Sequence, residues 1–172
     1  MTPHAYAEWV PLIERFRDGD DSALTAMRAG TMEWTNIVAE RWTSRMSEAL
    51  NVRLKKVSAD LQLALDRARG DAFSVSRAML GARRALAPLQ TAASLPCAPE
   101  NVRTHFADEL TRFIAQTQES LESGAKRIRV DNGTILKAIR DNPLTTPPPS
   151  PSEPDMPSDP QPPSGRGRRV IL

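Results

Sequence analysis

The chain has 172 residues and a formal net charge of +2, because 23 lysines and arginines nearly balance 21 aspartates and glutamates. So small an excess is only a weak indication of an anionic partner, even with a sequence pI near 9.0. A single cysteine, Cys97, excludes an intrachain disulfide and favours a reducing compartment. Because no signal peptide and no run of about 18 apolar residues is visible, we expect a cytoplasmic protein without a transmembrane segment.

Two parts of different composition divide the sequence. Nine of the 15 prolines fall between Pro147 and Pro163, whereas the preceding residues are rich in Ala, Leu and Arg. Aromatic residues make up only 5% of the chain, and β-branched residues never cluster as strands require. We therefore predict an all-α domain over residues 1–144 and a disordered, Pro-rich tail over residues 145–172.

The N-terminal part of the domain predicts two short helices. Apolar residues recur at helical spacing between Trp9 and Phe16. Pro11 is tolerated near a helix start, so the regular part of this first helix should begin around Glu8. After an Asp-Gly-Asp break, a second helix is predicted over Ala23–Ala29, which a glycine ends.

The segment Trp34–Arg69 contains neither Gly nor Pro and predicts one long helix, the spine of the domain. Thr31 and Gly70 supply its start and stop signals, although a break near Asn51 stays open as an alternative. Its apolar residues form one face, strictly at Leu50, Leu54, Val57, Leu61, Ala64 and Ala68, and less strictly at Trp34, Ile37, Val38, Trp42, Met46 and Ala49.

Two further long helices follow. A stripe of mostly small apolar residues predicts a helix over Asp71–Ala93, which Pro88 should kink or end near Ala87. The connection to the preceding helix is so short that the two should form an antiparallel hairpin. A third helix is predicted over Pro99–Arg129, with an apolar stripe at Val102, Phe106, Leu110, Phe113, Thr117, Leu121 and Ile128.

A last short helix is predicted over Thr134–Arg140. The Asn-Gly pair before it allows a short β-hairpin over residues 128–136 as an alternative, although isolated hairpins are marginally stable. The predicted architecture is an elongated up-down helical bundle, with three long helices and short terminal ones. Heptad-like, coiled-coil stripes on the long helices also favour a homo-oligomer. The other helices of one chain can be too short to cover the whole apolar stripe of a long helix, and a second copy can then cover the rest.

Catalytic, metal and cofactor chemistry finds little support in the sequence. Cys97 has no histidine near it, and His105 lacks the Glu-x-x-His repeats of a di-iron bundle. No Gly-x-Ser-x-Gly elbow and no phosphate-binding loop occurs. We therefore predict no enzyme, no cofactor and no metal site, with Cys97 tucked at a helix junction and His105 solvated or structural.

Basic residues on the long helix are candidate nucleic-acid contacts. Four carboxylates are interleaved with them, as on an ordinary solvated helix face, and no aromatic stacking platform accompanies them. Nucleic-acid binding is therefore the less favoured interpretation of this surface. The candidates are Arg41, Arg45, Arg53, Lys55 and Lys56, with Arg83 and Arg84 on the neighbouring helix.

The three tryptophans Trp9, Trp34 and Trp42 all occupy apolar-stripe positions. This placement favours core packing. The alternative is a groove or an interface, where tryptophan is enriched among residues that dominate binding energy.

The tail ends in a peptide of mixed chemistry behind a Pro-rich spacer of about 20 residues. Basic side chains can steer such a peptide, apolar ones can fill pockets, and a free carboxylate can be held by backbone amides. The alternative is an end without any partner. The residues predicted to bind are Arg166, Arg168, Arg169, Val170, Ile171 and Leu172.

These patterns favour a non-catalytic interaction, adaptor or assembly protein that docks a protein partner through its C-terminal peptide. The alternative is a nucleic-acid-binding accessory protein that uses its basic helix faces and Arg-rich C-terminus.

Overall fold

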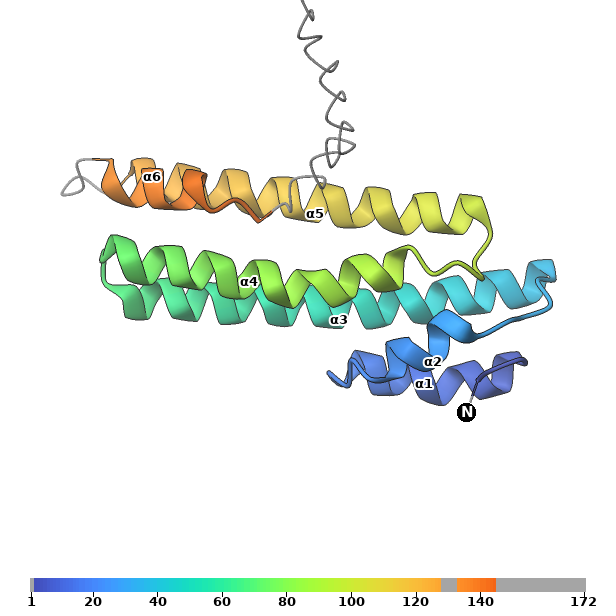
Figure 1. Ribbon diagram of the computed structural model, residues 1–172. Helices are drawn as coiled ribbons and strands as arrows, with labels where there is room; N and C mark the ends of the chain where they lie inside the picture. The colour runs from blue at the N-terminus through green and yellow to red at the C-terminus, as the bar shows by residue number, and fades with distance from the viewer. Residues whose placement is uncertain (1, 128–132, 145–172) are drawn as a thin grey trace, which may run out of the picture.

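The computed structural model describes residues 2–127 and 133–144, and in these ranges the chain forms six α-helices and no strand (Figure 1). Three long helices run up, down and up, which confirms the predicted all-α, elongated bundle. They are α3 (Asn36–Ala68), α4 (Ala72–Ala93) and α5 (Glu100–Lys126). Two short helices, α1 (Tyr6–Arg17) and α2 (Ala23–Ala29), precede them, and α6 (Thr134–Asp141) follows.

The short helices cover opposite ends of the long ones. In Figure 1, α1 lies against the N-terminal half of α3, and α6 runs back along the C-terminal end of α5. Helix α2 packs on α1 and contacts α4. Helix α6 packs on both α4 and α5. Because residues 134–136 begin this helix, the helical interpretation is confirmed for them, while residues 128–132 of the alternative hairpin lie outside the described residues.

Helix α3 is continuous and begins later than its first start signal. The side-chain oxygen of Thr35 accepts a hydrogen bond from the Val38 amide at 3.2 Å, so Thr35 is the N-cap. Thr31 does not cap it because its backbone is engaged elsewhere: its amide donates to the Pro3 carbonyl at 2.9 Å. The helix passes through residue 51 without a break. It ends at Arg69 (φ 48°) and Gly70 (φ 79°), two successive residues in the left-handed conformation.

The predicted apolar stripe of α3 is the centre of the core, although its first residues are not. Ile37 is 63% exposed and Trp34 is only partly buried, so the residues of the stripe are fully buried only from Trp42 onward. Beyond that point the strict stripe is confirmed, with only Ala64 half-buried. The buried apolar residues are Trp42, Met46, Ala49, Leu50, Leu54, Val57, Leu61 and Ala68.

Prolines lie inside two helices. Helix α4 continues past Pro88 to Ala93, so the prediction that Pro88 would end it near Ala87 is wrong. Buried side chains on both sides of it, Leu86 and Leu89, stabilise the helix and offset the hydrogen bond that proline cannot donate. Pro11 is equally interior to α1, which starts two residues before the expected Glu8.

The Glu8 carboxylate accepts hydrogen bonds from the two amides ahead of the helix, at 2.7 and 3.1 Å, and these bonds lower its pKa.

An aromatic cluster joins α1, α3 and α5. Trp42 is fully buried and meets three rings edge-on, with centroid distances of 6.1 Å to Trp9, 5.2 Å to Trp34 and 5.7 Å to Phe106. The Trp9 indole donates to the Thr31 carbonyl at 3.1 Å, whereas the Trp42 indole N–H has no partner among the described residues. Core packing is thus confirmed for Trp9 and Trp42, and Trp34 packs against the same core while partly exposed.

Helix α5 is covered over only part of its length. Its stripe is buried from Val102 to Ile114, but between Ile114 and Ala125 no residue is buried. The predicted stripe residues Phe113, Thr117 and Leu121 are only partly buried, and Ile128 lies outside the described residues. This uncovered half of α5 faces a cavity of about 600 Å³.

Candidate binding surfaces

A groove lies where the α3–α4 turn meets the C-terminal half of α5 and helix α6. Its volume is about 600 Å³, within the range of ligand pockets. Gly124 of α5 widens it, since a Cβ built there would meet no atom within 4 Å. We call it the α3–α5–α6 groove; its apolar lining comprises Leu65, Val75, Leu121, Ala125, Ile135 and Ile139.

The rim of the α3–α5–α6 groove is polar. Gln62 donates a hydrogen bond to the Asp66 carboxylate at 3.0 Å, and no lysine or arginine pairs with Asp66 in the described part of the chain. Arg69 stands on the rim too, held in the left-handed conformation by the turn. A neighbouring cavity of about 220 Å³ shares Gln62, Ser120 and Leu121 with the groove and extends it along α5. An apolar lining with isolated charges at its edge suits the side chains of a peptide.

Arg53, a predicted nucleic-acid contact, faces inward. Its guanidinium donates to the Phe16 carbonyl and to an Asp21 carboxylate oxygen, both at 2.8 Å, and lies 4.8 Å from the centroid of the Phe16 ring. The residue is 9% exposed. Arg53 therefore ties the end of α1 and the turn before α2 to the middle of α3.

The other four basic candidates on α3 are exposed, but they do not form one free basic surface. Arg45 donates to the Tyr6 hydroxyl at 3.0 Å and lies 3.5 Å from a Glu14 carboxylate oxygen. Lys56 pairs with Asp60 at 3.1 Å, one turn along the helix. Arg41 and Lys55 have no ion-pair partner among the described residues. Their role in nucleic-acid binding stays a prediction.

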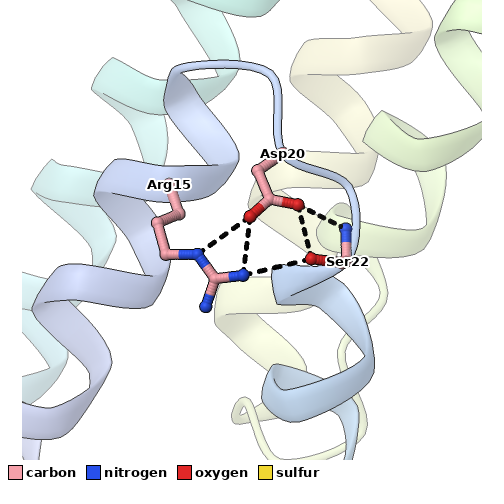
Figure 2. Close-up of polar contacts among 3 residues, drawn as sticks. All are labelled: Arg15, Asp20 and Ser22. Atoms are coloured by element: carbon pink, nitrogen blue, oxygen red, sulfur yellow. Dashed lines mark hydrogen bonds and ion pairs between the residues drawn. The ribbon is translucent and has the colours of Figure 1, made fainter.

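A polar cluster closes the turn between α1 and α2 (Figure 2). The Arg15 guanidinium donates to one oxygen of Asp20 at 2.6 and 2.9 Å, while the amide and hydroxyl of Ser22 donate to the other. These bonds, first that from the Ser22 hydroxyl and then that from Arg15, lower the pKa of Asp20. The Asp20 carboxylate beside the Ser22 hydroxyl is paired with Arg15 and has a lowered pKa, which makes it a weak base, so the cluster serves to hold the turn. Its sequence signal is the aspartate two residues before Ser22, the spacing of an Asx turn.

Cys97 and His105 do not meet in the fold as a nucleophile and base. Burial raises the pKa of the half-buried Cys97 thiol, which disfavours the reactive thiolate. His105 lies 3.3 Å from a carboxylate oxygen of Glu109, one turn along α5, and both are well exposed. No cluster of three metal-ligating side chains occurs among the described residues.

The outer face of α4 carries an apolar and basic stripe, of which only Arg84 was predicted as a contact. Phe73 is 70% exposed and Leu80 is 39% exposed, and the Arg77 guanidinium lies 5.9 Å from the Phe73 ring centroid. Together with Arg84 they follow steps of four, three and four, opposite the buried stripe. The sequence signal that could have revealed this stripe is the complete absence of Asp and Glu from α4.

The predicted docking residues of the tail, 166 and 168–172, lie outside the described residues. Within the ranges the structure describes, no helix has both the length and the apolar character that crossing a membrane requires. No protein family, curated protein or solved structure matches the chain.

Proposed function

We propose that the chain is a non-catalytic interaction protein, an adaptor or assembly factor that docks a protein partner through the peptide Arg166–Leu172. The observation that carries this proposal is the uncovered α3–α5–α6 groove, a cavity of about 600 Å³ with an apolar lining. Uncovered apolar surface on a folded domain is typical of interaction sites. The lone cysteine supports a cytoplasmic location.

The polar side chains of the described helices support the same proposal. Arg53 and Arg15 are used to hold α1 and α2 in place. Large apolar side chains are also exposed among the charged residues of these helices: Phe73 on α4, at 70% exposure, and Ile37 and Leu63 on α3, at 63% and 48%. A second copy of the chain or another helical partner would bury such side chains, which is the basis for proposing assembly.

The peptide is tested by capture from a lysate with the full chain as bait. Val170→Asp, Ile171→Asp and Leu172→Asp together remove its apolar side chains and add three carboxylates. A matched control, Ser150→Asp, Ser152→Asp and Ser158→Asp, adds the same charge elsewhere in the tail. We expect the captured proteins to disappear with the first variant and to remain with the second. Equal capture by both variants would exclude the peptide as the docking element.

The second candidate function, nucleic-acid binding, is favoured by the outer face of α4, where Arg77 and Arg84 occur on a helix without carboxylates. Phosphate contacts make affinity fall steeply with salt, with a logarithmic slope of about −0.9 per contact on B-DNA. This function predicts that Arg77→Glu with Arg84→Glu, or Lys55→Glu with Lys56→Glu, weakens binding to DNA or RNA. If electrophoretic mobility at low salt shows no shift for the unmodified chain, this candidate is rejected.

A further inference from the structure

We propose that the α3–α5–α6 groove is the intramolecular seat of the chain's own segment Arg168–Leu172, so that the docking peptide is stored on the domain until a partner displaces it. The seating of the segment in the groove does not require a partner, whereas its displacement rests on the proposed function. Three features support it: the place where the described chain stops, the length of chain that follows, and the apolar residues near residue 172.

The described chain stops beside the groove. Leu144 is buried at 2% exposure, and its amide donates a hydrogen bond to the side-chain oxygen of Gln118 on α5 at 3.2 Å. Gln118 lies three residues before Leu121, one helical turn from the groove lining. Helix α6 contributes Ile135 and Ile139 to that lining. The segment that follows Leu144 thus leaves the domain within one or two helical turns of the cavity.

The length of chain that follows allows its end to return. Twenty-five residues, 145–169, separate Leu144 from Val170. A linker of this length spans about 25–30 Å on average as a flexible coil and up to about 78 Å as extended polyproline. Both lengths exceed the distance to a groove that begins one turn away. Tethering of this kind gives an effective concentration of about 1 mM, so even a weak segment is held.

The chemistry of the segment matches the groove. Between residues 145 and 172 the large apolar residues are Met156 and the contiguous Val170, Ile171 and Leu172. Three adjacent branched side chains fit an aliphatic lining built from Leu, Val and Ile. Asp66 at the rim, which has no ion-pair partner among the described residues, offers a carboxylate to Arg168 or Arg169, directly before the apolar residues.

Seating in the groove makes binding of a partner competitive. A segment with an intrinsic Kd of about 0.1 mM at an effective concentration of about 1 mM occupies the groove in a ratio of about 10 to 1. Only the released fraction of the segment is free to dock. Occupation of the groove by the segment therefore lowers its apparent affinity for a partner about tenfold. Blocking the groove should reverse this loss.

Gly124→Trp provides the block without disturbing the fold. A Cβ at Gly124 meets no atom within 4 Å, and replacing a helical glycine favours the helix, so the indole fills the groove instead of unfolding α5. Gly81→Trp is the matched control, because Gly81 is also helical and open but lies on the outer part of α4. Circular dichroism of both variants should show the helicity of the unmodified chain.

The test is methyl NMR of the full chain at two concentrations tenfold apart. We expect the Ile135 and Ile139 methyl resonances to shift when Val170, Ile171 and Leu172 are replaced by Asp, and nuclear Overhauser contacts to connect Leu172 with Ile139 at both concentrations. Gly124→Trp should abolish those contacts and Gly81→Trp should keep them. The proposal is overturned if the Ile135 and Ile139 chemical shifts do not change with the tail substitutions. It is also overturned if the contacts disappear on dilution, because a second copy of the chain then supplies the tail. Neither outcome bears on whether the tail variant loses its captured proteins. The seating proposal can therefore fail while the docking proposal holds, and the reverse is also possible.

Discussion

Trp42→Ala is expected to destabilise the domain by about 3–5 kcal/mol, the usual cost of removing a fully buried large aromatic side chain. Trp42 is 0% exposed and its ring meets those of Trp9, Trp34 and Phe106. The substitution leaves a cavity between α1, α3 and α5 that rigid neighbours cannot fill, and it also removes three edge-to-face contacts.

Urea unfolding followed by circular dichroism measures this loss. The matched control is Phe73→Ala, which removes another aromatic ring but one that is 70% exposed, and surface changes of this kind usually stay within about 0.5 kcal/mol. A Trp42→Ala midpoint close to that of Phe73→Ala would show that the aromatic cluster is not the centre of the core.

Arg53→Ala is expected to cost about 2–4 kcal/mol and to loosen α1 and α2 before the long helices unfold. The change removes a charged hydrogen bond to the Phe16 carbonyl, an ion pair with Asp21 and a cation–π contact. The Phe16 carbonyl keeps a second donor, the Gly19 amide at 3.1 Å, so the loss comes from the contacts of the arginine itself. Arg53→Lys should not restore stability, because a single ammonium group cannot donate to the Phe16 carbonyl and the Asp21 carboxylate with the geometry of a guanidinium.

A double-mutant cycle with Asp21→Ala isolates the ion pair, and amide hydrogen exchange in α1 reports the local loosening. The control is Lys56→Ala, since the exposed Lys56–Asp60 pair on the same helix should contribute less than about 0.5 kcal/mol. If Arg53→Ala unfolds no earlier than Lys56→Ala, the side chain is not the clamp that its contacts indicate.

The helices were predictable because local signals and burial agree over most of the chain. Residues 34–69 were expected as one helix, and α3 spans Asn36–Ala68 with the expected stripe buried. The errors lie where tertiary contacts override a local signal. Thr31 has the chemistry of a cap, but its backbone is occupied by Pro3 and Trp9. Pro88 has the chemistry of a terminator, but the flanking burial carries α4 onward.

The binding surfaces were less predictable, since they depend on which helices become neighbours. A groove forms where α5 extends beyond what α3 and α4 cover, and no residue pattern along α5 alone reveals that. Arg53 has the same sequence signature as Lys55 and Lys56, two and three positions later. Only the position of α1 distinguishes them, because the buried arginine points at Phe16 while the lysines face solvent.

This division between a helical scaffold and a separate recognition segment is tested most directly by deleting Ser150–Leu172 and measuring fold and capture on the same preparation. We predict unchanged helicity by circular dichroism, a stability change of at most about 1.4 kcal/mol from the lost groove contact, and loss of the captured proteins. A large fall in helicity, or capture that survives the deletion, would contradict the proposal.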